Sequence, residues 1–142
     1  MKTLDTLIRL HKRTLDELRR NMGALENQKA QLQQAIQAMQ KELDKEIALA
    51  GKQPEMANFF GGFAKRIKNR QDIIHQEIRA LDVKITALNK EIFEAFTELK
   101  KYEIAKENAK LRAREEEKRK ETLMLDEIAS QQYQKKQKMN DA

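Results

Sequence analysis

Apolar residues recur at alternating steps of three and four along residues 1–43, and again along residues 60–113. Eleven of the thirteen positions in the first series are apolar, and fourteen of the sixteen in the second. The first series is Met1, Leu4, Ile8, His11, Leu15, Leu18, Met22, Leu25, Lys29, Leu32, Ile36, Met39 and Leu43. The second is Phe60, Ala64, Ile67, Gln71, Ile74, Ile78, Leu81, Ile85, Leu88, Ile92, Ala95, Leu99, Tyr102, Lys106, Ala109 and Ala113. A spacing of about 3.5 residues is typical of the a and d positions of a coiled coil, so two long packed helices are predicted.

The composition favours long helices over a globule or a disordered chain. Of 142 residues, 37% are charged and 5% are aromatic, which leaves too little apolar volume for a thick globular core. High charge with few aromatic residues also marks disordered chains. Strong helix formers dominate here, however, and there are only one proline and four glycines. An all-α fold follows.

The two series are separated by the segment "AGKQPEMANFFGG", which contains the only proline of the chain. Gly51 suits the left-handed position after a helix, and Pro54 suits a turn or the first residue of the next helix. We expect one domain over residues 1–142, a long antiparallel two-helix coiled-coil hairpin with an overhanging C-terminal helix. Its expected parts are helix one at about 3–50, a turn at about 51–59, helix two at about 60–135 and a disordered end at about 136–142.

A reversal near residue 55 would bring Leu4 close to Lys106 and leave residues beyond about 110 without a partner in the same chain. Lys29 and Gln71 are polar residues inside the seam, and their ordinary role is to define the register of the two helices. An isolated charged helix is marginal in water unless something packs on it. The overhang as a whole suggests a protein partner. For the apolar residues in "LMLDEIA", a partner contact and a frayed helix end are equally compatible with the composition.

Catalysis, cofactors and metals are not indicated. There is no cysteine, and the two histidines, His11 and His75, lie far apart in the sequence. The chain lacks a phosphate-binding glycine loop, a secretory leader and an apolar stretch of membrane-spanning length. We expect a cytoplasmic protein that is not an enzyme and binds no small-molecule ligand.

The net charge of +6 raises the question of nucleic acid. The excess is +2 in residues 1–50, +3 in residues 51–110 and +1 in residues 111–142. Acidic residues are interleaved throughout, whereas a phosphate-binding surface concentrates its basic residues on one face. No nucleic-acid partner is expected.

Candidate partner-binding residues fall into four segments. The aromatic cluster near the turn could close the hairpin or present an apolar contact, and both interpretations stay open. Apolar residues in "LMLDEIA" lie beyond any expected partner in the same chain, and arginines near the start of helix one and around residue 113 are further segment-level candidates. The candidates are Phe59, Phe60, Phe63, Arg9, Arg13, Arg112, Arg114, Leu123, Leu125 and Ile128.

The segments "MKTLDTLIRLHKRTLDELRR", "FFGGFAKR" and "LMLDEIASQQYQKK" resemble those of the FliJ family, the stalk proteins of the bacterial flagellar export ATPase. The resemblance covers nearly the whole chain in layout. It implies a stalk of the flagellar type III export apparatus, on the cytoplasmic side of the membrane at the flagellar base. The implied partners are the export ATPase ring, the membrane export gate and export chaperones, with membrane association through protein contacts only. The alternatives are a coiled-coil scaffold or tether, and the equivalent stalk of a virulence type III secretion system.

Overall fold

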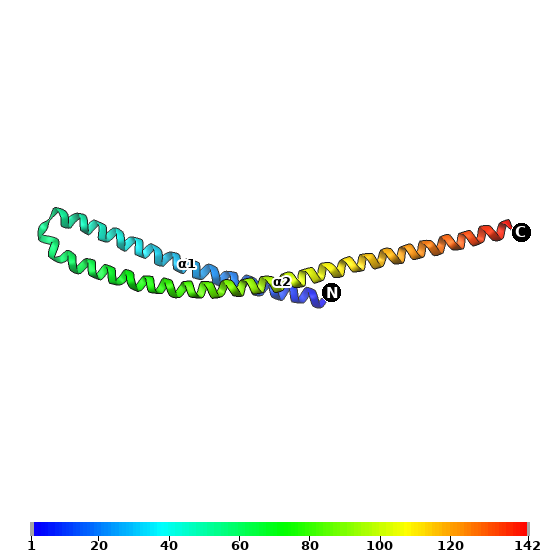
Figure 1. The fold of residues 1–142 in the computed structure, drawn as a ribbon, viewed down its shortest axis with the longest axis horizontal. Coiled ribbons are helices and arrows are strands. Elements are labelled where there is room, and N and C mark those ends of the chain that lie inside the picture. The colour runs from blue at the N-terminus through cyan, green and yellow to red at the C-terminus, as the bar shows by residue number, and fades with distance from the viewer. Residues whose placement is uncertain (1, 142) are drawn as a thin grey trace. The chain divides into compact units, whose positions relative to one another are not determined.

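The computed structural model describes residues 2–141, apart from the side chains of Met56 and Ala57. The chain forms helix α1 (Lys2–Lys52), a short 3-10 helix η1 (Pro54–Met56) and helix α2 (Ala57–Asn140) (Figure 1). No strand occurs among the described residues. The predicted all-α two-helix hairpin is confirmed. Met1, the first predicted seam residue, lies outside the described residues.

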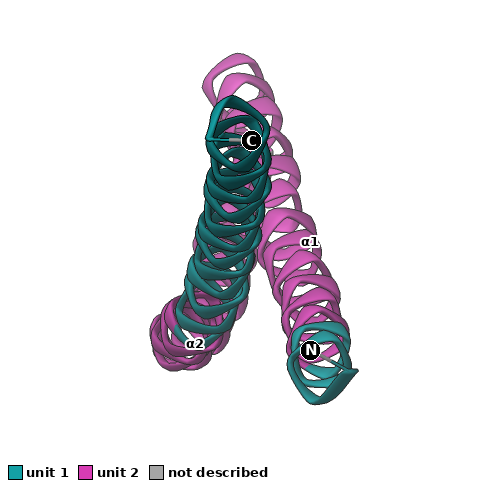
Figure 2. Cartoon of the chain, turned by 90° about the vertical axis from the view of Figure 1, so that its right-hand side faces the viewer, with its two compact units in different colours: residues 1–10, 98–142 teal, residues 11–97 magenta. Residues whose placement is uncertain are grey.

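The two helices contribute to two compact units (Figure 2). Unit 2, residues 11–97, contains most of α1, the turn and the first half of α2. Unit 1 contains α1 up to Leu10 together with α2 from Glu98 onward. Each unit is described by itself below.

In unit 2 the predicted seam forms the core. Leu15, Met22 and Leu43 from α1, and Ile67 and Leu81 from α2, are at most 8% exposed. All other predicted seam residues of this unit are partly buried, including the polar residues His11, Lys29 and Gln71. A two-helix fold has no second layer to cover these side chains, so burial is confined to one stripe on each helix.

Polar contacts fix the register of the hairpin in unit 2. The Lys29 ammonium lies 2.6 Å from the Asp82 carboxylate, and the Gln71 side-chain amide donates to the Gln40 side-chain oxygen at 3.2 Å. In both pairs the residue numbers add to 111, so the two helices pair around a centre between residues 55 and 56. That centre lies in η1. Lys29 and Gln71, the polar residues of the seam, therefore each contact the opposite helix, which is the behaviour expected of residues that define the register.

The turn differs from the expected one in its use of glycine. Gly51 is inside α1, and no described glycine has a positive φ angle. The helix instead ends with the Gln53 N–H donating to the Leu49 carbonyl at 2.9 Å, directly before Pro54. Proline begins η1, where its missing N–H costs nothing. The prediction for Gly51 was wrong, because an ordinary helical bond and Pro54 are enough to end α1.

In unit 1 the N-terminal turns of α1 pack on α2. Ile8 and Leu99 are 8% and 6% exposed, and the Lys106 ammonium lies 2.6 Å from the Asp5 carboxylate. The hydrogen bond from Lys106 is the main cause that lowers the pKa of Asp5. The residue numbers of Asp5 and Lys106 also add to 111, as in the two pairs of unit 2. This ion pair lies next to the expected pairing of Leu4 with Lys106.

Beyond this contact α2 continues without a covering helix. Ala109 is the last partly buried residue, and residues 110–141, called the terminal segment below, are exposed throughout. The helix extends to Asn140, whereas the sequence predicted an end near 135. Residues 136–140 contain no proline or glycine, and lysine, glutamine and methionine are good helix formers.

Candidate functional site

The three phenylalanines at the turn gather around one small pocket of unit 2. Phe59, Phe60 and Phe63 line it together with Glu46, Ala50 and Arg66, and its volume is about 190 Å³. The pocket exists because the seam near the turn carries small or polar residues. In the register of the hairpin Ala50 is level with Phe60, and Glu46 is level with Ala64. A space of this size is below the range of about 300–1,000 Å³ that is usual for small-molecule sites.

The three rings differ in exposure. Phe60 and Phe63 are partly buried against the end of the hairpin, whereas Phe59 is 76% exposed. Ile47 and Leu49, in the last turns of α1, are each 49% exposed. Closure of the turn therefore accounts for Phe60 and Phe63, and Phe59 is left as an apolar side chain facing solvent.

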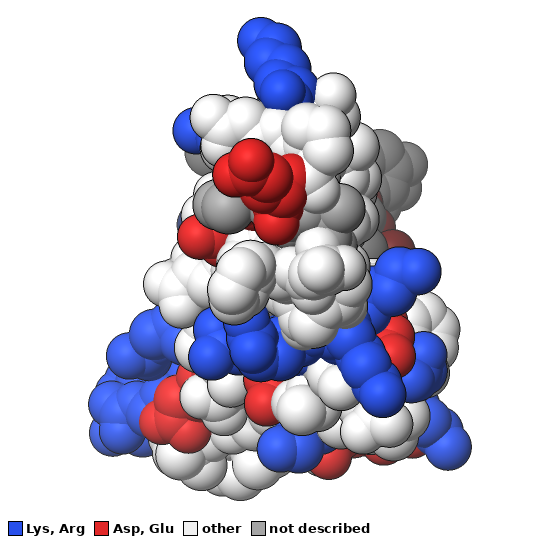
Figure 3. Space-filling view, turned by 90° about the vertical axis from the view of Figure 1, so that its left-hand side faces the viewer, with Lys and Arg blue, Asp and Glu red and all other residues white. Residues whose placement is uncertain are grey.

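Basic residues lie near these rings in the sequence, a feature that counting charge over three long segments missed. Lys52, Lys65, Arg66, Lys68 and Arg70, here called the basic cluster, are all exposed. Residues 51–70 hold these five basic side chains and one acidic one, Glu55, for a net charge of +4 out of +6. Figure 3 looks onto this end and shows an uncharged surface bordered by lysine and arginine side chains, with a carboxylate among them. A charge count in windows of about twenty residues would have found it.

The terminal segment of unit 1 carries the second group of candidates. Leu123, Leu125 and Ile128 are 62%, 66% and 46% exposed. At about 100° per residue, Ile128 lies about 60° around the helix from Leu125, whereas Leu123 lies about 160° from Leu125. The structure thus brings Leu125 and Ile128 together on one side of a single helix and separates Leu123 from them.

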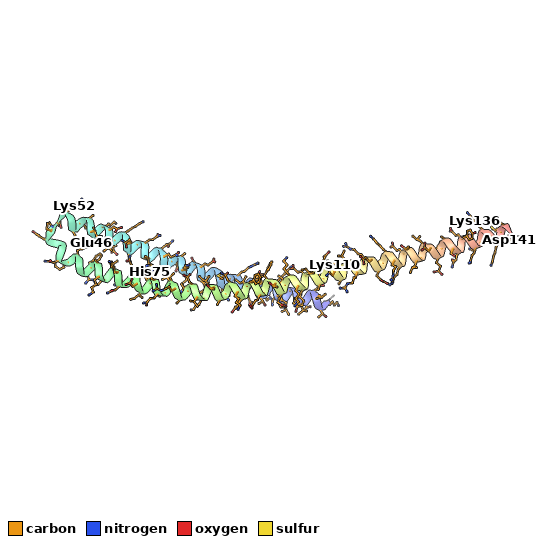
Figure 4. The ribbon with its side chains drawn as sticks, in the orientation of Figure 1. Glu46, Lys52, His75, Lys110, Lys136 and Asp141 are labelled. Carbon is orange, nitrogen blue, oxygen red and sulfur yellow. The ribbon has the colours of Figure 1, made fainter. Side chains whose placement is uncertain are left out.

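Charged side chains support the helix between these residues and the contact with α1. Arg119 donates to Glu116 at 3.1 Å one turn back, and pairs of this type add a few tenths of a kcal/mol each. Arg112 donates through Nε to the Asn108 carbonyl at 3.5 Å, and Arg114 is exposed. Figure 4 shows the side chains of this segment, from Lys110 to Asp141, projecting from a single helix.

The remaining candidates lie on α1. Arg9 is exposed in unit 1, and Arg13 is exposed in unit 2. His75 is exposed and His11 is partly buried. Within residues 2–141 no three metal-binding side chains converge, and none of the described helices combines the length and apolarity needed to cross a bilayer.

Comparison with known proteins identifies a family. A family model described as "Flagellar FliJ protein" matches residues 1–138, which is nearly the whole chain and includes both the turn and most of the terminal segment. No curated protein and no solved structure matches significantly.

Proposed function

The chain belongs to the FliJ family of coiled-coil proteins related to flagellar export, and from this premise we propose that it is the non-enzymatic stalk of the type III export apparatus. In this role the terminal segment binds in the pore of the export ATPase ring. The hairpin couples the ring to the membrane export gate and to the chaperones that deliver substrates. The place of action is the cytoplasmic side of the flagellar base.

The observation that carries this proposal is the exposed terminal segment. It is helical from residue 110 to Asn140, yet every described residue in it is exposed. A single helix is about 10–12 Å across with its side chains, which is slender enough for the centre of a protein ring. Leu125 and Ile128 offer an apolar face that nothing within the described chain covers. Burying that face against a ring would remove apolar surface from water, which favours binding.

Register locking in unit 2 supports the mechanical part of the proposal. Lys29 with Asp82 and Gln40 with Gln71 bind the two helices in one register. A shift of the helices would break both pairs at once. A hairpin that resists sliding is suited to carry a displacement from one end to the other, as a stalk requires.

The test measures ATP hydrolysis by the cognate flagellar export ATPase with and without the full chain. We expect the chain to raise hydrolysis or ring assembly, and removal of residues 114–142 to abolish the effect. Leu125→Ala combined with Ile128→Ala should weaken the stimulation several-fold, because the double substitution removes most of the apolar face.

Ile73→Ala is the matched control, since Ile73 is 56% exposed on α2 within unit 2. This control should stimulate as the wild type does. If the full chain changes neither hydrolysis nor ring assembly, the stalk proposal is rejected. If Ile73→Ala lowers stimulation as much as the double variant, the terminal segment is not the contact.

A further inference from the structure

The turn end of unit 2 combines exposed apolar side chains with a net positive charge. It has exposed apolar side chains, of which Phe59 at 76% is the most exposed phenylalanine. It also has the basic cluster, which gives residues 51–70 a net charge of +4. The other 122 residues carry only +2. Burial of apolar side chains and attraction of anions are therefore available at the same place.

The basic residues lie on both sides of the aromatic rings in the chain. Lys52 ends α1, where Figure 4 labels it at the turn, and the other four lie in the opening turns of α2. Within the described part of the chain, none of the five is in an ion pair, and all are exposed. Their charges are thus directed to solvent around an apolar centre.

The tip of the hairpin by itself offers less area than a specific protein interface needs. Two helices side by side, each about 10–12 Å across, present on the order of 200 Å² when met end-on. A specific protein interface buries about 800 Å² on each partner. A lipid surface has no such requirement, because side chains can enter it and be surrounded by headgroups and acyl chains.

We propose that the turn end of the hairpin binds the surface of an anionic phospholipid membrane directly, with Phe59 entering the headgroup boundary and the basic cluster holding the anionic headgroups. Aromatic and basic residues act together in this way on membrane surfaces, and each basic residue near the surface adds to the attraction. The sequence led us to expect membrane association through contacts with other proteins only. A direct lipid contact is therefore an addition to the proposed function. It is measured with the chain by itself, so its outcome is independent of the ATPase test.

The experiment is co-sedimentation of the full chain with vesicles of phosphatidylcholine, with or without phosphatidylglycerol. We expect binding to the mixed vesicles that weakens as salt rises to about 0.15 M, since salt screens the charges. Lys65→Glu combined with Arg66→Glu should lower the partition coefficient by about tenfold or more. Phe59→Ala should lower it several-fold, with helicity by circular dichroism unchanged.

Two matched controls separate this end from the rest of the molecule. Lys135→Glu with Lys136→Glu makes the same change of charge at exposed positions of the terminal segment. Phe93→Ala removes a ring that is 70% exposed elsewhere on α2. Both should bind as the wild type does. No binding to anionic vesicles at low salt overturns the proposal and returns this end to an acidic protein partner. Equal losses in the controls and the turn variants overturn it too.

Discussion

Lys29 shows how one polar residue in an apolar seam selects a pairing partner. In an antiparallel hairpin an a position is level with a d position, so the Lys29 stem lies level with Leu81 and its ammonium reaches Asp82 at 2.6 Å. In an in-register parallel dimer two Lys29 side chains would meet at the same level with no carboxylate between them. Such a pair of like charges in the seam is unfavourable. The same residue that interrupts the apolar pattern therefore favours the hairpin.

Asp5 supplies a prediction at this scale. Its pKa is lowered, chiefly by the hydrogen bond from Lys106. A carboxyl with a lower pKa in the folded state stabilises the fold above its unfolded pKa of about 4, and this contribution is lost as pH falls through the folded value. Asp5→Asn should therefore lower the thermal midpoint at pH 7, and the difference from the wild type should vanish near pH 2.

The measurement is thermal unfolding followed by circular dichroism at both pH values. Asp16→Asn is the control, because it removes the same charge at an exposed position of α1. A deficit for Asp5→Asn that persists unchanged at low pH would contradict the assignment to the ion pair.

At the scale of the elements, the helices are interrupted only where the chain must reverse. Gly23, Gly61 and Gly62 all lie inside helices, and none has a positive φ angle. Glycine therefore plays no conformational role in these helices that alanine could not fulfil. The chain reverses at Gln53 and the three-residue 3-10 helix Pro54–Met56, after which α2 begins. The continuity of α1 and α2 follows from their high content of helix formers.

Gly23 provides a prediction for α1. A Cβ added at Gly23 would meet no heavy atom within 4 Å, so alanine fits without rearrangement. Because glycine lowers helix stability by about 0.5–1 kcal/mol relative to alanine, Gly23→Ala should raise the free energy of unfolding by about that amount. Urea unfolding followed by circular dichroism measures the change. The reverse substitution next to it, Ala24→Gly, should lower the value to a similar extent, and a destabilised Gly23→Ala would contradict the prediction.

At the scale of the whole molecule, stability and interaction surface are separated along the chain. The buried residues Leu15, Met22, Leu43, Ile67 and Leu81 lie in unit 2, and Ile8 and Leu99 lie in unit 1. None of the residues from 110 to 141 is even partly buried. The core that stabilises the fold therefore does not depend on the terminal segment.

Removal of residues 112–142 should accordingly leave the thermal midpoint of the remaining chain within about 2 °C of the full-length value. The helical signal per molecule should fall roughly in proportion to the residues removed. Circular dichroism melts of both chains provide the measurement. A large drop in the midpoint would mean that the terminal segment packs on the hairpin, which would also weaken its assignment to the ATPase ring.

The sequence allowed the seam and the reversal near residue 55 to be predicted because both are local properties. The apolar period of about 3.5 residues can be recognised within each helix on its own. The described seam residues up to Ala109 are buried or partly buried. Ala113 is the exception, since no residue of α1 is level with it. The end of α2 was less predictable, because a polar helix end has no breaker to mark it.

What the sequence determined by itself is the helical class, the seam and the approximate place of the turn. Only the tertiary structure decided which residues face one another across the hairpin. A shift of one helix by seven residues would keep apolar residues opposite apolar residues, so periodicity alone cannot choose a register. The contacts of Lys29 with Asp82 and of Gln40 with Gln71 identify the register that the chain adopts. That register places Ala50 level with Phe60, and the structure leaves Phe59 exposed among the basic cluster, because a hairpin end has no third element to cover it.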